Sequence, residues 1–162
     1  MSATGQAAAE DNLEYVGFWA RLGASLIDSV LVLLICAPLA TAIYGEDYWL
    51  SESFVHGPAD VLINWVLPAV AVLLFWTYRQ ATPGKVAIRA RIVDARTGGQ
   101  PTTRQLVIRY LGYYLSTLPL LLGFVWVAFD PRKQGWHDKL AHTVVVRPRG
   151  GGTDAVRFDQ AG

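Results

Sequence analysis

The sequence predicts an α-helical membrane protein with two full transmembrane helices, a third apolar region and a small cytoplasmic β-hairpin-like element. The 162-residue chain is 52% hydrophobic and only 17% charged. Its mean hydropathy of +0.29 is seldom reached by an ordinary soluble domain of this size. Long uncharged runs alternate with loops that differ sharply in Lys and Arg content. The formal net charge of +1 gives no reason to expect nucleic-acid binding.

The first predicted span covers about residues 18–44. Between Arg21 and Glu46 its only charge is Asp28, and the run exceeds the roughly 20 helical residues that cross a hydrocarbon core. Residues 1–14 carry three acidic side chains and no basic one, so no cleavable signal peptide is evident. We expect residues 1–14 to be a disordered cytoplasmic segment and the first span to act as an uncleaved anchor.

The second predicted span covers about residues 61–78, which carry no charge. Pro68 lies within it, and Trp65 and Trp76 lie toward its ends, where aromatic rings favour the membrane interface. The preceding loop, 45–60, contains no Lys or Arg, whereas residues 79–104 contain six. Because basic loops remain in the cytoplasm, residues 79–104 and the amino terminus are both expected on the cytoplasmic side.

The third apolar region, at about residues 106–129, has two interpretations. Pro119 and Gly123 divide it, which favours a re-entrant or split helical hairpin that enters and leaves on one side. The basic residues that follow favour the same topology, because they place the tail in the cytoplasm. The alternative is three simple spans. The glycine-rich residues 148–162 are expected to be disordered, which leaves 15–147 as the membrane domain.

Two segments are expected to form strands on the cytoplasmic side. Residues 86–93 alternate in a period of two and lead to a Gly98-Gly99 turn, a pattern typical of an amphipathic strand. The run HTVVVRP, at 142–148, is rich in β-branched residues. Pairing between the two requires them to lie on one side of the membrane.

Two charges in the first span define the candidate site. Arg21 and Asp28 are nearly two helical turns apart, so they share a stripe with Ser25 at a separation of about 10 Å. An Asp that faces lipid within a span costs roughly 2.5–3.5 kcal/mol. Asp28 therefore needs a donor from another element.

Polar residues elsewhere in the chain supply the candidate partners. The donors considered for Asp28 are Arg109, Tyr113, Tyr114 and Asn64. The acceptors considered for Arg21 are Asp138 and Asp130. We expect a membrane-embedded cluster of Arg21, Asp28, Arg109 and Asp138. An equally weighted interpretation is that these charges only fix helix packing.

Several spaced blocks resemble the RDD family of small bacterial membrane proteins. The blocks are GFWARLGASLIDSVLV, TPGKVAIRARIVDARTGGQPT, RYLGYY and FVWVAFDPRKQGWHDKLAHTVVV. The resemblance covers about residues 15–147 and places the family's Arg and two Asp on Arg21, Asp28 and Asp138. It implies a multi-pass protein of the bacterial cytoplasmic (inner) membrane. It implies little about activity, although some members are described as cation/proton antiporters.

Two functions are weighed equally. In ion transport (cation/proton exchange), Asp28 binds a proton or monovalent cation, with Asp138 and His137 at the cytoplasmic mouth. One subunit with so few spans then implies a homo-oligomer. In the alternative, the protein is a non-enzymatic membrane scaffold or accessory subunit whose charged cluster is structural. Its cytoplasmic segments then bind a membrane-protein partner or the anionic lipid of the bilayer.

An enzyme is not expected from this sequence. His137 and His142 are five residues apart and do not stack on one helical face, so no metal site is predicted. TPGK lacks the upstream Gly and the hydroxyl of a phosphate loop, and Pro83-Gly84 is interpreted as a turn. No cofactor is expected. Ser25, Arg109 and His137 are assigned supporting roles around the family-motif residues.

Overall fold

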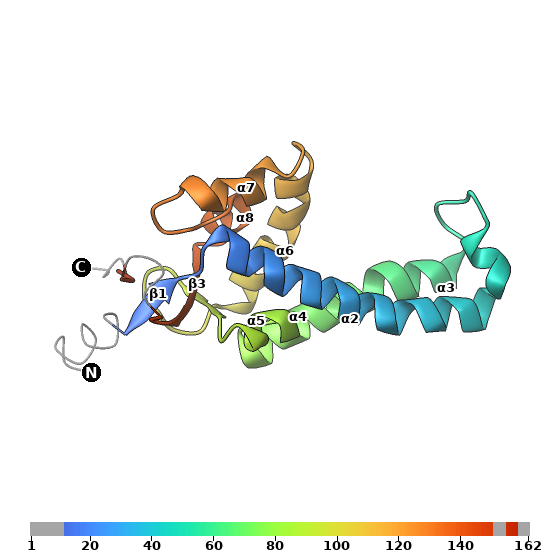
Figure 1. Cartoon of the computed structure of the whole chain (residues 1–162), viewed down its shortest axis with the longest axis horizontal. Helices are drawn as coiled ribbons and strands as arrows, with labels where there is room; N and C mark the ends of the chain where they lie inside the picture. The colour runs from blue at the N-terminus through green and yellow to red at the C-terminus, as the bar shows by residue number, and fades with distance from the viewer. Residues whose placement is uncertain (1–11, 151–154, 159–162) are drawn as a thin grey trace.

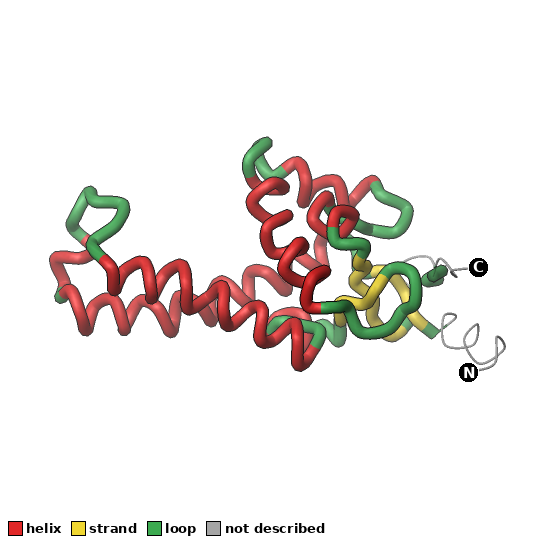
Figure 2. Tube along the Cα trace, turned by 180° about the vertical axis from the view of Figure 1, so that it is seen from behind, coloured by secondary structure: helices red, strands yellow, loops and turns green. Residues whose placement is uncertain are grey.

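The computed structural model describes residues 12–150 and 155–158 of the chain. A long helical hairpin projects from a denser end, where a small sheet and the shorter helices gather (Figure 1). The same division is plain from behind, with the strands confined to one end of the molecule (Figure 2). Most of the two segments expected to be disordered, 1–14 and 148–162, lies outside the described residues.

The hairpin consists of two apolar arms. The first is α2 (Phe18–Tyr44), an unbroken helix of 27 residues. The second runs over Pro58–Arg79 as α3 (Pro58–Val61), η2 (Leu62–Val66) and α4 (Leu67–Arg79). Both arms are long and apolar enough to cross a membrane, which agrees with the two predicted spans. The second arm begins three residues earlier than expected because Pro58 opens it, and proline suits the first turn of a helix.

The second arm accommodates its internal proline by a local widening. η2 is one turn of π-helix, in which the Leu67 N–H donates to the Leu62 carbonyl oxygen. This turn directly precedes Pro68, which has no N–H to donate and whose ring crowds the preceding turn. The arm therefore stays helical through the proline. At the tip of the hairpin, η1 (Glu46–Trp49) follows the first arm.

The third apolar region is split, as Pro119 predicts. It forms α6 (Thr103–Thr117) and α7 (Leu122–Phe129), whose axes differ by 101°. Leu120 and Leu121 have positive φ angles of 52° and 64°, and the chain turns sharply within the four residues between the helices. α6 starts three residues before the expected position because Thr102 and Gln105 form a capping box.

A three-stranded antiparallel sheet lies at the base of the hairpin. Its order is β1 (Leu13–Tyr15), β3 (Thr143–Pro148), β2 (Arg91–Asp94). The predicted pairing of the two strand segments is present, with Ile92 opposite Val145. The central strand also pairs with β1, where Glu14 lies opposite Arg147.

Three expectations about these segments need correction. The predicted strand over 86–93 is too long, because Pro83–Ala87 forms a short helix, α5, and only Arg91–Asp94 is extended. Leu13 and Glu14 were assigned to a disordered segment but belong to β1, since β3 offers them a free edge. The tail is likewise ordered in part, because Val156 is buried against the sheet.

The sheet is buried on both faces. Val144 and Val146 pack with Tyr15 and Val93 on one face, whereas Val145 packs with helical residues such as Trp76 on the other. Because neighbouring strand residues point to opposite faces, the uninterrupted Val144–Val146 run fits a strand covered on both sides. Most of the hairpin surface, in contrast, is exposed and apolar, which suits a lipid environment.

Candidate functional site

The site centres on Asp138, which lies in the five-residue helix α8 (Trp136–Leu140). Its side chain is completely buried. Oδ2 accepts a hydrogen bond of 3.0 Å from the Gly135 backbone N–H, as carboxylates at the third position of a helix often do. The helix thus fixes the carboxylate, and both oxygens remain available to partners from other elements.

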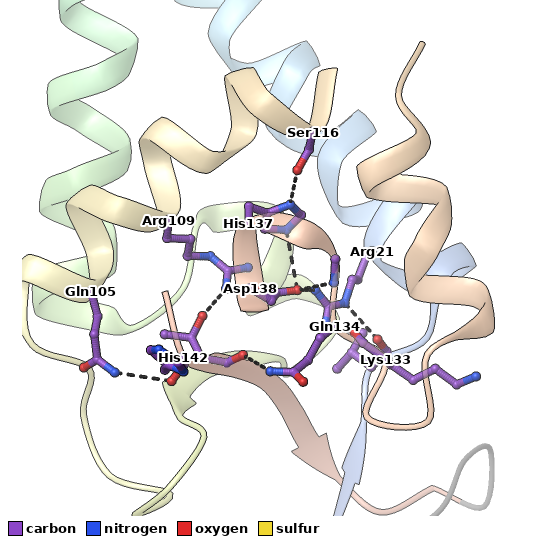
Figure 3. A network of polar contacts seen from close by, with 12 residues as sticks. Arg21, Gln105, Arg109, Ser116, Lys133, Gln134, His137, Asp138 and His142 are labelled. Atoms are coloured by element: carbon purple, nitrogen blue, oxygen red, sulfur yellow. Dashed lines mark hydrogen bonds and ion pairs between the residues drawn. The ribbon is translucent and has the colours of Figure 1, made fainter. Parts of the chain in front are cut away.

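Two arginines from different helices bind this carboxylate (Figure 3). Arg21 of α2 donates from Nη1 to Oδ2 at 2.5 Å, and Arg109 of α6 donates from Nη1 to Oδ1. Arg21 also donates to the Val16 and Lys133 carbonyl oxygens at 2.8 and 2.5 Å. The structure therefore brings together three of the four residues expected to cluster, and Asp138, not Asp130, is the acceptor for Arg21.

Arg109 extends the cluster to the sheet and to the aromatic core. It donates to the Thr143 hydroxyl at 2.7 Å, at the start of β3. Its guanidinium carbon lies 5.4 Å from the ring centre of Trp76 and 5.9 Å from that of Tyr113, within the range of cation–π attraction. The triad Arg21–Asp138–Arg109 thus joins α2, α6, α8 and β3.

The electrostatics of the triad keep Asp138 ionised. Burial alone would raise the pKa of this carboxyl, but Arg109 and Arg21 outweigh that effect and hold the pKa well below its usual range. The neighbouring His137 behaves differently. Burial lowers the pKa of its imidazole to about 3, so the ring is neutral at pH 7 and contacts the Ser116 hydroxyl at 3.2 Å through Nδ1.

Asp28 does not belong to this triad, which corrects the expected four-residue cluster. Its carboxylate accepts a hydrogen bond from the Thr82 hydroxyl at 2.5 Å and another from the Gly84 backbone N–H at 2.7 Å. None of the four expected donors binds it, and Asn64 instead donates to Asp60 at the tip of the hairpin. Asp28 lies two helical turns after Arg21, so it is beside the start of α5 and not beside the two arginines. The first N–H groups of α5 have no partners within the helix and can donate to it.

The contact between α5 and α2 is unusually close. A Cβ atom on Gly84 would lie only 2.0 Å from the Ala24 carbonyl oxygen. The Pro83-Gly84 pair, which the sequence suggests is only a turn, therefore starts a helix that packs directly on α2. The signal for this contact was the glycine itself, which allows two backbones to approach.

Sequence reasoning missed Lys85 as a site residue. It follows Gly84 in α5 and is buried, with 7% of its surface exposed. Its ammonium is 3.4 Å from the Thr82 hydroxyl, and no ion pair among the described residues includes it. The signal was a lysine inside a largely apolar segment, TPGKVAI.

Two cavities meet beside Lys85. The first, of about 300 Å³, has Arg21 and Arg109 in its wall. The second, of about 370 Å³, has Asp28 in its wall. Lys85 and Ser25 line both. Within the described part of the chain, no group of three or more His, Cys, Asp or Glu side chains is arranged to hold a metal ion.

This fold and these contacts define a class of small membrane proteins: an apolar helical hairpin whose base is joined to a sheet by a buried Arg–Asp–Arg triad. The chain belongs to the RDD family, whose model matches residues 15–142. It is 28% identical to an uncharacterised protein of Rickettsia prowazekii, over 82% of this chain and 96% of that protein. It is 30% identical to the uncharacterised membrane protein YteJ of Bacillus subtilis, over 83% of this chain and 82% of that protein. No solved structure matches the chain significantly.

Proposed function

We propose that this RDD protein is a non-enzymatic membrane scaffold or accessory subunit in which the Arg21–Asp138–Arg109 triad is structural. The observation that carries the proposal is the pairing of Asp138 with both arginines and with the Gly135 N–H. A carboxylate held by three donors, with its pKa far below the usual range, does not exchange protons near neutral pH. It is well suited to holding elements together.

We also propose that the protein lies in the inner membrane of a bacterium, with its sheet on the cytoplasmic side. β1 precedes the first arm, β2 follows the second, and β3 follows α8. Hydrogen bonds join all three strands, so the segments that carry them share one side of any membrane that the hairpin crosses. The basic loop 79–104 supports the cytoplasmic side.

A triple apolar replacement tests the structural role of the triad. Arg21→Met, Arg109→Met and Asp138→Leu together should give a folded protein, because well-packed apolar residues often substitute for a buried ion cluster without loss of stability. Asp138→Leu alone should fail to accumulate, since it leaves two buried guanidinium groups without a carboxylate. Membrane abundance and size-exclusion profiles of the two variants would distinguish these outcomes. Equal accumulation of both variants would contradict the proposal.

Ion transport is the second candidate, and one observation favours it. Among the described residues, Asp28 is bound only by neutral donors, and it lines the larger cavity. Within the expected cluster, its carboxylate is therefore the one that forms no ion pair with a described residue. In this alternative Asp28 binds a proton or a monovalent cation, and a homo-oligomer completes the path.

Flux measurements separate the two functions. Purified protein in liposomes should show no proton-coupled Na⁺ or K⁺ movement above protein-free liposomes if the scaffold proposal is correct. Flux that Asp28→Asn abolishes, and that the exposed control Asp47→Asn retains, would establish transport instead.

A further inference from the structure

Lys85 carries a buried positive charge that no carboxylate in the described part of the chain neutralises. A buried ammonium normally has an anionic partner, yet the only polar contact among the described residues is the Thr82 hydroxyl at 3.4 Å. That hydroxyl already donates to Asp28 at 2.5 Å. The ammonium thus lacks a strong acceptor at a point where two cavities meet.

Two further donors beside these cavities also lack an acceptor. Trp76 lines the larger cavity and Arg109 the smaller one, and both side chains are buried. The Trp76 indole Nε1 and the Arg109 Nε have no hydrogen-bond partner among residues 12–150 and 155–158. Buried N–H groups are rarely left unpaired. Two donors without an acceptor, together with an ammonium whose one contact is a long bond to a hydroxyl, predict a ligand that is rich in oxygen acceptors.

The charged side chains around the cavities also favour an anionic ligand. Their walls contain three cations, Arg21, Lys85 and Arg109, and one carboxylate, Asp28. Asp138 behind the wall offsets one more positive charge, so the region retains an excess of one cation. Both oxygens of Asp28 already accept hydrogen bonds. The site is therefore complementary to an anion.

Most of the other side chains that line both cavities are apolar, and several of them are partly exposed at the protein surface. Leu22 and Val125 border the smaller cavity, and Leu31 and Ile35 border the larger one. Each of these side chains is more than one third exposed. A molecule within a bilayer would therefore reach both cavities laterally, past side chains that suit hydrocarbon.

We infer that the two cavities form a binding site for one anionic phospholipid, with its phosphate beside Lys85 and its acyl chains along α2. The phosphate oxygens would supply the missing acceptors, and the apolar walls would cover the upper part of the chains. This inference is independent of the scaffold proposal, because a transporter would bind such a lipid equally well.

Native mass spectrometry of the purified, delipidated full-length protein tests the site. Phosphatidylglycerol should be retained more strongly than phosphatidylcholine when each is added at the same concentration. Lys85→Gln should weaken phosphatidylglycerol binding by about thirtyfold or more, the loss typical of removing one member of a buried charge pair. Lys139→Gln removes an exposed lysine outside both cavities and should bind like the wild type.

A second variant keeps the test independent of the lysine. Ser25 lines both cavities and is exposed on α2, so Ser25→Phe should fill their junction without removing any charge. It should reduce phosphatidylglycerol retention as strongly as Lys85→Gln does, while circular dichroism shows the same helix content.

Four results would overturn the inference, and the first three concern the site itself. They are unchanged retention in Lys85→Gln and Ser25→Phe, equal retention of phosphatidylcholine and phosphatidylglycerol, and displacement of phosphatidylglycerol by millimolar inorganic phosphate. The last result would indicate a site for a free anion. An equal loss in Lys139→Gln would indicate attraction to the protein surface in general, and would also overturn it.

Discussion

Asp138 is the side chain on which the base of the hairpin most depends. Asp138→Asn leaves Arg21 and Arg109 buried beside a neutral amide, and breaking a buried ion pair in this way costs about 3–5 kcal/mol. We expect a large decrease in thermal stability, measured by intrinsic fluorescence in detergent. Asp47→Asn, in the exposed element η1, should leave the transition unchanged. A midpoint for Asp138→Asn within 2 °C of the wild type would show that the triad contributes little.

His137 should make the protein sensitive to mild acid. Its pKa falls from 6.5 to about 3 on folding because the ring is buried. Between these values the unfolded chain binds the extra proton, so stability decreases as pH falls below 6.5, by about 1.4 kcal/mol per pH unit. Denaturant titrations at pH 5.0, 5.5 and 6.0 should show this slope.

The matched control for this pH dependence is the exposed His142. His137→Gln should flatten the slope between pH 5 and 6 even where it lowers overall stability, since the titrating group is gone. His142→Asn should keep the slope, because asparagine tolerates the positive φ of 51° at this position. The depressed pKa of Asp138 adds stability that is present above pH 4 and lost only in stronger acid. A slope that persists in His137→Gln would assign the effect to another group.

At the scale of elements, the packing of α5 on α2 depends on Gly84. Gly84→Ala places a methyl group 2.0 Å from the Ala24 carbonyl oxygen, so the two helices must separate and the hydrogen bonds to Asp28 are lost. We expect poor accumulation and a lower unfolding temperature. Gly23→Ala, in α2, meets no atom within 4 Å and should stabilise the helix by up to about 1 kcal/mol. Similar stability for the two variants would contradict this packing.

α5 also shows why part of the fold could not be predicted from the sequence. The period-two pattern over 86–93 is a real strand signal, but Asp28, more than 50 residues earlier in the chain, binds the Gly84 N–H and stabilises a helix there. Arg89, with a positive φ of 55°, then separates helix from strand. Local patterns do not contain such tertiary contacts. The spans, the break at Pro119 and the β2–β3 pairing were predictable because hydropathy, proline and β-branched runs act locally.

The candidate site, too, could be predicted from the sequence only in part. Helical geometry places Arg21 and Asp28 on one stripe, and the need for a partner made Asp138 a candidate for Arg21. Nothing in the spacing shows that Asp28 binds backbone and hydroxyl donors, or that Lys85 is buried. Both depend on the approach of α5 to α2, which is a property of the folded chain.

The arrangement of the whole molecule predicts which segments lie on the same side of a membrane. β1, β2 and β3 form one sheet at the base of the hairpin, whereas the loop 50–57 lies at the opposite tip (Figure 1). If the two arms cross the membrane, single cysteines at Gly99 and Gly150 must lie on one side, and one at Ser53 on the other. Cys36 is first replaced by Ala, so that the introduced thiol is the only one.

Labelling with a membrane-impermeant maleimide in intact bacterial cells gives the measurement. Ser53→Cys should react in intact cells, whereas Gly99→Cys and Gly150→Cys should react only after the membrane is opened. The Gly150 position is decisive, because three simple spans would place it outside while leaving Gly99 inside. That arrangement would require the β2–β3 hydrogen bonds to break, since strands on opposite sides of a bilayer do not pair. External labelling at Gly150 would therefore contradict both the one-sided arrangement and the sheet.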